Sequence, residues 1–200
     1  MRLIRGFITA IGIIGILFII ALIMGYYLFC LTPPIKAKMA PAMPSAEAAE
    51  SFNQKFETFE AEIEAAVDAG EEREVSLAIT EQEVNNKMLD VLAEGELPLK
   101  SVLINFGDGH FLAYVVVENP GVSAKTGVLA QIKVVDGGLK IAVEDFDLGK
   151  LPLPQSAKNG VGELLTIMVR LKLTDLPLEI TNVEISNHKL TVVGSTKAAD

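Results

Sequence analysis

The sequence predicts an α+β protein, with an N-terminal transmembrane helix followed by antiparallel β-hairpins packed with two or three helices. Three observations predict this fold class. An unbroken apolar run extends from Phe7 to Leu31. Apolar residues recur at helical spacing in several later segments. Three strand–turn–strand patterns follow one another between residues 102 and 193.

The charge distribution divides the 200-residue chain and excludes several classes of protein. Residues 1–38 hold four basic side chains and no acid, so residues 39–200 hold 13 bases against 26 acids. A nucleic-acid-binding domain needs a basic stripe on its folded part, so we expect no nucleic-acid partner. The one cysteine, Cys30, excludes an intrachain disulfide framework. With only two histidines in the chain, we expect no metal site and no cofactor.

The apolar run predicts a transmembrane helix over residues 7–31, preceded by a cytoplasmic leader, residues 1–6. At about 1.5 Å per residue, this helix can cross a hydrocarbon core of about 30 Å with some tilt. Arg2 and Arg5 favour a cytoplasmic N-terminus, which leaves the rest of this single-pass protein outside the cell membrane. The alternative is a cleaved signal peptide, because Ala40-Pro41-Ala42 resembles a cleavage site. Signal peptides, however, have shorter apolar regions.

A proline-rich linker and an acidic helix are predicted next. Residues 32–44 hold four prolines and are expected to lack regular structure. Residues 45–70 predict an acidic amphipathic helix that Ser45 caps. Its apolar stripe consists of Phe52, Phe56, Phe59, Ile63 and Ala66. We favour packing of this stripe on its own domain, because the stripe is too short for a coiled coil. In the alternative, Phe52, Phe56, Phe59 and Ile63 bind an envelope protein or a second copy of the chain.

Residues 71–197 are expected to form the extracytoplasmic domain. Residues 75–79 alternate as a strand, and Thr80 and Glu83 form a capping box that begins a helix ending near residue 93. Three hairpins with Gly, Asp or Asn in their turns follow. They pair residues 102–106 with 111–117, 132–135 with 139–143, and 183–185 with 190–193. A helix over residues 155–171 is predicted from Val161, Leu164, Leu165 and Met168.

Alternation along these strands predicts one apolar inner face. The candidate ligand-binding residues on it are Ile104, Phe106, Phe111, Val115, Ile132, Ile141, Val143 and Val192. The strand over residues 111–117 is also apolar on its other face, through Leu112, Tyr114 and Val116. Such a strand is covered on both faces, the interpretation we favour, or it lines a cavity for an apolar ligand.

No residue pattern in the sequence indicates catalysis. The sequence has no Gly-x-Ser-x-Gly motif, and Cys30 lies inside the predicted transmembrane helix. His188 lies in a predicted turn, and His110 follows one. The acidic cluster around Asp145 lacks the spacing of a calcium-binding loop. We therefore expect no catalytic residues and no enzyme activity.

The sequence resembles the YpmS-like family of bacterial membrane-anchored proteins and, more distantly, the LmeA-like phospholipid-binding proteins. Beside the N-terminal anchor, the similar features are the helix start Ile79-Thr80-Glu81-Gln82-Glu83-Val84-Asn85, the segment Phe146-Asp147-Leu148-Gly149-Lys150-Leu151-Pro152-Leu153-Pro154, and a closing hairpin that ends in Val193-Gly194. The resemblance implies a TULIP-like fold, in which a strongly curved antiparallel sheet wraps around a helix and leaves an apolar groove. It brings no catalytic residues.

Two functional hypotheses follow. In the first, the protein is a membrane-anchored, extracytoplasmic binding protein of the bacterial cell envelope. It holds a lipid or another apolar ligand in the groove between sheet and helices. In the alternative, it is a non-enzymatic interaction or scaffold protein that docks a partner, or itself, through the acidic helix.

Overall fold

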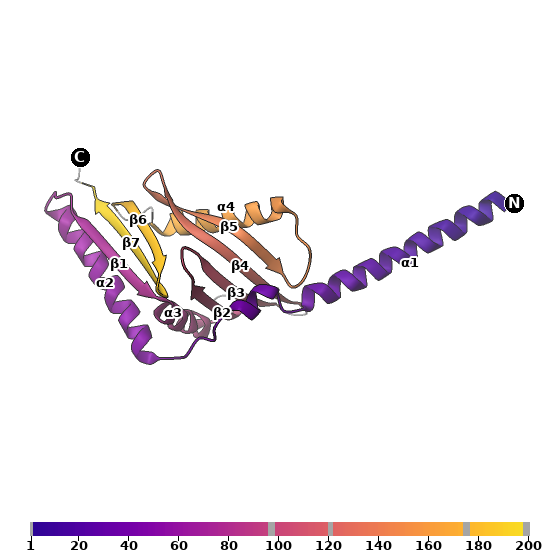
Figure 1. Cartoon of the computed structure of the whole chain (residues 1–200), viewed down its shortest axis with the longest axis horizontal. Coiled ribbons are helices and arrows are strands. Elements are labelled where there is room, and N and C mark those ends of the chain that lie inside the picture. Colours follow the sequence, from indigo (N-terminus) through magenta and orange to yellow (C-terminus); the bar gives the residue numbers. More distant parts are fainter. Residues whose placement is uncertain (1, 96–98, 120–121, 174–176, 198–200) are drawn as a thin grey trace.

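The computed structural model describes residues 2–95, 99–119, 122–173 and 177–197, and it has the predicted α+β class (Figure 1). The helices are α1 (Arg2–Cys30), the 3-10 helix η1 (Pro34–Lys38), α2 (Ala46–Asp68), α3 (Glu81–Glu94) and α4 (Gln155–Leu173). The strands are β1 (Glu74–Thr80), β2 (Leu99–Phe106), β3 (Phe111–Asn119), β4 (Val122–Val135), β5 (Gly138–Leu148), β6 (Leu178–Ser186) and β7 (Lys189–Thr196). Strand β4 begins well before the predicted residue 132.

The strands form two antiparallel sheets rather than the single sheet that the sequence suggested. One has the order β1-β7-β6 and the other the order β2-β3-β4-β5, so all three predicted hairpins are confirmed. Strand β6 meets the hairpin turns of the larger sheet. The N–H of Gly109 donates to the carbonyl of Ile185 at 2.8 Å, and the N–H of Ile180 donates to the carbonyl of Gly137 at 2.9 Å. Because β6 faces turns and not a full strand, the strand pairing of the smaller sheet ends at β6.

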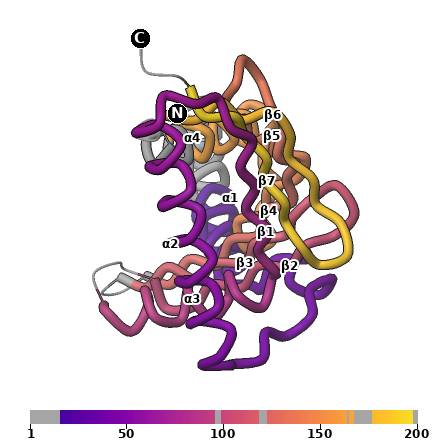
Figure 2. The backbone as a smooth tube through the Cα atoms, turned by 90° about the vertical axis from the view of Figure 1, so that its left-hand side faces the viewer, coloured from indigo at the N-terminus to yellow at the C-terminus, as the bar shows by residue number. Residues whose placement is uncertain are grey.

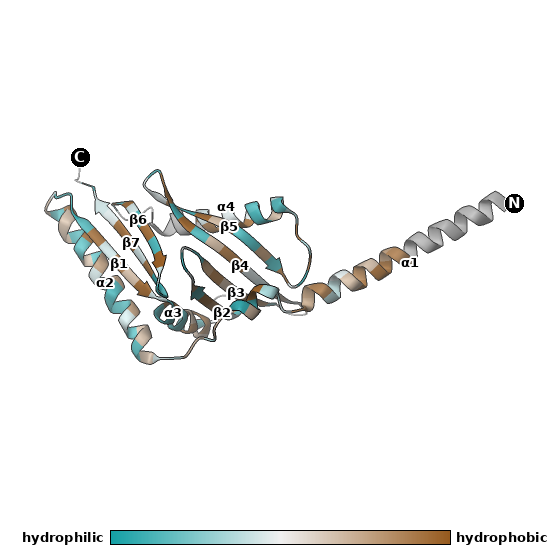
Figure 3. Cartoon of the chain, viewed as in Figure 1, coloured by the Kyte–Doolittle hydropathy of each residue, from teal (hydrophilic) through white to brown (hydrophobic). Residues whose placement is uncertain are grey.

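Helix α1 projects away from the other elements (Figure 1). Ile16 to Ile20 occupy more than one full turn, and each of these side chains is 50–64% exposed. This stretch of the helix is therefore uncovered on every face, and Figure 3 shows that the described part of α1 is mostly hydrophobic. The side chains of residues 2–15 lie outside the described set. By length and composition, α1 is able to cross a membrane, which is consistent with a membrane anchor or a signal sequence.

The predicted linker has a structured part that covers the larger sheet. Pro34–Lys38 form η1, in which Ile35 is only 2% exposed. A side chain on Gly127 of β4 would collide with Ile35, so the glycine permits this close approach. Met39 packs on a cluster of Leu103, Tyr114 and Val116. The second apolar face of β3 is therefore covered, by residues for which the sequence predicts no regular structure.

The acidic helix α2 lies on its own domain, as the favoured interpretation expected. Its N-cap is Ser45, whose hydroxyl accepts a hydrogen bond from the N–H of Ala48 at 3.2 Å. Phe59 and Ile63 are buried against Val75 and Leu77 of β1. In Figure 2, α2 and α4 lie on the same side of the strands.

Helix α3 begins at the predicted capping box and is anchored by a buried carboxylate. The Thr80 hydroxyl accepts from the N–H of Glu83 at 3.2 Å, and the N–H of Thr80 donates to Glu83 Oε2 at 2.8 Å. Glu83 also binds two side chains of α2, the hydroxyl of Ser51 at 2.6 Å and the ammonium of Lys55 at 2.7 Å. Burial works to raise the pKa of Glu83, but the hydrogen bonds from Lys55, Ser51 and Thr80 outweigh it and hold this pKa below its ordinary value.

Candidate functional site: a pocket between α4 and β5

Strand pairing brings nearly all of the predicted groove residues onto one face of the larger sheet. Directly opposed residues of an antiparallel sheet share a face. Phe106 pairs with Phe111, and Ile132 pairs with Ile141. This face is called the α4 face, because Leu165 of α4 packs on it. It carries the predicted residues Ile104, Phe106, Phe111, Val115, Ile132, Ile141 and Val143.

Val192 lies elsewhere, which corrects the prediction that it lines the same surface. Its partners are Leu77 of β1 and Val183 of β6, both in the three-stranded sheet. Leu77 packs beneath α2 with Phe59 and Ile63. The pairing of β7 with β1 therefore separates Val192 from the other candidates. This pairing joins segments far apart in the sequence, so the local alternation pattern did not reveal it.

The α4 face is covered in its middle. Val128 and Ala130 of the central strand β4 are 8% and 0% exposed, whereas Val143 of the edge strand β5 is half-buried. A cluster of Val128, Ala130 and Ile141 forms the core beneath Leu165. The central strands are thus packed, and any ligand space lies toward the edge of the sheet.

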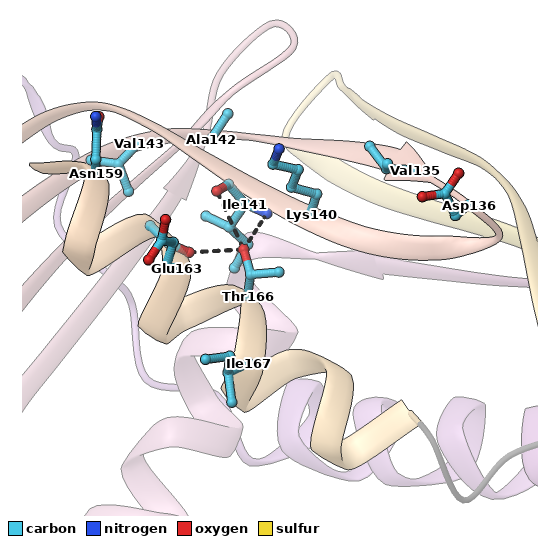
Figure 4. A pocket seen from close by; sticks show the side chains of 11 residues that line it. Val135, Asp136, Lys140, Ile141, Ala142, Val143, Asn159, Glu163, Thr166 and Ile167 are labelled. Atoms are coloured by element: carbon cyan, nitrogen blue, oxygen red, sulfur yellow. Dashed lines mark hydrogen bonds between the residues drawn. The ribbon is translucent and has the colours of Figure 1, made fainter.

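Helix α4 is fixed to that edge by Thr166. The N–H of Ile141, on the open edge of β5, donates to the Thr166 hydroxyl at 2.9 Å, and this hydroxyl donates to the carbonyl of Gly162 at 2.8 Å (Figure 4). A Cβ on Gly162 would lie 3.3 Å from the carbonyl oxygen of Ile141, so a glycine here lets the helix approach the strand closely. The side chains of Leu164 and Met168, both predicted on the apolar face of α4, lie outside the described residues.

A pocket of about 690 Å³ lies between α4 and β5 (Figure 4). Such a volume suits a small organic ligand. Its apolar lining comes from Val135, Ile141, Ala142, Val143 and Ile167, of which Ile167 is 53% exposed. Its polar lining comes from Asp136, Lys140, Asn159, Glu163 and Thr166.

The lining is better suited to binding an amphiphilic ligand than to catalysing a reaction. The apolar part can bury CH₂ groups, which stabilises binding by about 0.8 kcal/mol each. Lys140 and Asn159 can bind a polar head group at the rim. Sequence reasoning identified Ile141 and Val143 but missed the polar lining of α4. The spacing of Asn159, Glu163 and Thr166, beside the apolar stripe of that helix, was the available signal.

An ion pair holds the first turns of α4 on β5. Lys158 Nζ lies 2.6 Å from Asp145 Oδ1. The hydrogen bond from Lys158 holds the pKa of Asp145 below its ordinary value, against the opposing effect of burial. Asp147 accepts the N–H of Ile35 at 3.2 Å. These two acids of the sequence cluster are therefore engaged in structural contacts.

The four candidate partner-binding residues of the acidic helix separate into two pairs. Phe59 and Ile63 are buried in the domain at 5% and 1% exposure. Phe52 and Phe56 stack with ring centroids 6.2 Å apart, and Phe56 is 37% exposed. A partner of α2 would therefore meet Phe52 and Phe56.

Both histidines lie at turns. His110 Nδ1 is 2.9 Å from the carbonyl oxygen of Asp108 within its own turn, and His188 Nδ1 is 3.2 Å from Glu81 Oε2. Among the residues that the structure describes, no group of three His, Cys, Asp or Glu side chains could hold a metal ion.

Comparison with protein-family models and with curated proteins finds no match for this sequence.

Proposed function

We propose that this chain is a single-pass, membrane-anchored binding protein of the cell envelope. In this proposal it has no enzyme activity, and it holds a lipid acyl chain or another apolar ligand between α4 and β5. The observation that carries the proposal is the pocket lined by Ile141, Val143 and Ile167. It lies at the edge of the face that the sequence predicted to bind an apolar ligand.

The packing of η1 supports an anchor that is retained. Cleavage after Ala42 would remove Ile35, which packs against Gly127, and Met39, which packs on Leu103 and Tyr114. That loss would expose apolar surface of the larger sheet, which is unfavourable in water. Arg2 and Arg5 favour a cytoplasmic N-terminus and an extracytoplasmic domain.

The resemblance to TULIP-like proteins adds the expectation of a curved sheet that wraps around a helix. The two hydrogen bonds between β6 and the turns at Gly109 and Gly137 support this part of the proposal, because they join the two sheets edge to turn. The position of α2 and α4 on one side of the strands supports it as well (Figure 2). Lipid binding does not follow from a fold alone, so the pocket itself must be tested.

Photo-crosslinking tests the pocket directly. The full chain in nanodiscs is incubated with a palmitate analogue that carries a diazirine, irradiated, and digested for peptide mapping. We expect adducts on α4 and β5 peptides. Ile167→Lys places a charge in the apolar lining at an exposed position, so it should abolish most of these adducts. Leu89→Lys is the matched control, because Leu89 is 42% exposed on α3, outside the pocket. Adducts confined to α1, or equal labelling in both variants, would contradict the proposal.

One observation favours the alternative, a docking role for α2. The stacked rings of Phe52 and Phe56 leave an aromatic surface beside an acidic helix face, and aromatic residues are enriched at protein interfaces. Concentration-dependent self-association that Phe56→Ala abolishes, together with a pocket that takes up no probe, would support this alternative instead.

A further inference from the structure

The loop between β5 and α4, residues 149–154, caps the end of α1. The N–H of Lys150 donates to the carbonyl of Leu28 at 2.8 Å, in the last turn of that helix. Gly149 has a φ of 60°, and a Cβ there would collide with the backbone of Leu28 and Phe29. The N–H of Gly149 donates to the carbonyl of Lys125 in β4, also at 2.8 Å. The loop is therefore joined to α1 on one side and to the larger sheet on the other.

Helix η1 also stabilises the junction between α1 and the larger sheet, through contacts with β4 and β5. Ile35 is buried against Gly127 of β4, and its N–H donates to Asp147 Oδ2 of β5 at 3.2 Å. Pro33 is also fully buried. The few residues between α1 and the sheet are thus packed, so the direction of α1 sets the orientation of the larger sheet.

The depth of this contact follows from the length of the apolar run. A helix over residues 7–31 is about 37 Å long, roughly 7 Å more than a hydrocarbon core of about 30 Å. With the excess shared between both ends, Leu28 lies within about 1 Å of the core boundary. Tyr26 and Tyr27, just before it, are of the residue type enriched at the membrane–water interface, so the last turn of α1 lies beside the headgroup layer. A loop whose backbone is hydrogen-bonded to Leu28 lies at that layer too.

The composition of the loop suits this position. The Lys150 side chain is exposed, and Leu151 and Leu153 are half-buried. Lysine near an anionic membrane surface strengthens binding to that surface. Although the chain has a net charge of −9, Lys36, Lys38, Lys125 and Lys150 all belong to segments that meet at this end. The acidic helix α2 lies at the opposite end of the protein from α1 (Figure 1).

The nearby acids cancel only part of this positive charge. Asp145 is paired with Lys158, and the neutral N–H of Ile35 does not neutralise Asp147. The four lysines nevertheless outnumber Asp147 and the exposed Glu144. Among the described residues, no acid forms an ion pair with Lys125 or Lys150. An anionic surface is therefore the complementary partner for this end of the protein.

We propose that the loop over residues 149–154 lies on the anionic phospholipid headgroups of the membrane that holds α1. Lys150 contacts lipid phosphates, and this second membrane contact keeps the domain in one orientation. The inference rests on the proposed function in one respect, that α1 is a membrane anchor; it does not depend on a ligand in the pocket.

Spin-label accessibility in nanodiscs tests this inference. Single cysteines replace Leu153, Ile20 and Glu72 in a full chain that carries Cys30→Ser. The nanodiscs contain phosphatidylcholine alone or an equal mixture with phosphatidylglycerol. Lipid-soluble oxygen and a water-soluble nickel chelate then report the depth of each label. We expect lipid values at residue 20, interfacial values at residue 153 and aqueous values at residue 72.

The outcomes separate the two proposals. Lys150→Glu should move the label at residue 153 several-fold toward aqueous accessibility in the anionic nanodiscs, whereas Lys189→Glu, at another exposed lysine, should not. Lys150 caps α1 through its backbone N–H, so this substitution leaves the cap in place. Aqueous values at residue 153, or no effect of Lys150→Glu, would overturn the inference while the label at residue 20 remains in lipid. Aqueous values at residue 20 would overturn the proposal that α1 is a membrane anchor.

Pro152→Cys, at an exposed position, provides a second label site if Leu153→Cys disturbs the fold.

Discussion

The side chain of Asn85 satisfies both backbone groups of Ile104. The N–H of Ile104 donates to Asn85 Oδ1 at 2.7 Å, and Asn85 Nδ2 donates to the carbonyl of Ile104 at 2.6 Å. Strand β2 is one edge of the larger sheet, and at the other edge Thr166 binds the N–H of Ile141. Each edge of the sheet is thus closed by a polar side chain from a helix, which blocks pairing with another strand.

Loss of the Asn85 contact should destabilise the protein. Asn85→Ala leaves two backbone groups of Ile104 without their partners, and each unsatisfied buried group costs about 1–3 kcal/mol. We expect the free energy of unfolding to fall by about 2 kcal/mol or more in denaturant titrations of the full chain in detergent. Gln82→Ala, at an exposed position of the same helix, is the control. Equal stability of the two variants would show that water replaces the Asn85 side chain without cost.

The buried Glu83 should make stability depend on pH. Its pKa is lower in the folded chain than its ordinary value of 4.5, so the folded state binds fewer protons than the unfolded state in this range. The contribution of Glu83 is therefore complete above pH 4.5 and is lost as the pH falls below it toward the folded value. Thermal unfolding between pH 7 and pH 3 measures this.

Glu83→Gln should remove that part of the pH dependence. It should also lower stability at neutral pH by about 2 kcal/mol, because hydrogen bonds to a charged group are lost. Glu57→Gln, at an exposed position of α2, should keep the wild-type profile. The same acid transition in Glu83→Gln as in the wild type would assign the pH dependence to other carboxyls.

Ile35 should be important for stability, although it lies in the predicted linker, four residues after the end of the predicted transmembrane helix. Truncation of a buried isoleucine to alanine costs about 2–5 kcal/mol. We expect a loss in this range for Ile35→Ala and almost none for Lys38→Ala, whose side chain is exposed at the end of η1. A loss of less than about 0.5 kcal/mol for Ile35→Ala would indicate that residues 32–44 behave as a free linker.

Gly149 should determine how rigidly α1 is joined to the domain. Gly149→Ala combines a positive φ with a collision against the backbone of α1. We expect a broader distance distribution between spin labels at residues 20 and 72 in nanodiscs. Gly70→Ala is the control, because Gly70 has a φ of 67° and open space around its Cβ position. A narrow distribution in Gly149→Ala would contradict a rigid junction.

Local signals predicted the elements of this fold well. The caps formed by Ser45 and by Thr80 with Glu83 need only neighbouring residues, and both are confirmed. The three hairpins were equally local, since turn residues and alternation determine them. Curvature of the sheet and ligand binding remain predictions.

Long-range contacts were the part that the sequence did not reveal. Helix α3 buries the polar residues Glu83, Asn85 and Asn86 and leaves Leu89 42% exposed, the reverse of the usual amphipathic pattern. Asn86 is buried because it accepts the N–H of Ser45 at 2.7 Å, a partner 41 residues away. Val192 and Ile35 were misjudged for the same reason, since their neighbours come from distant segments.

Native mass spectrometry of the full chain, released from its host membrane in mild detergent, tests the central claim most directly. Residues 33–39 must be retained, because they cover the larger sheet. The account predicts one bound lipid per chain in the wild type and in Leu89→Lys, and none in Ile167→Lys. A lipid-free mass for the wild type, with no uptake from added phospholipid vesicles, would contradict the claim that the pocket between α4 and β5 holds an apolar ligand.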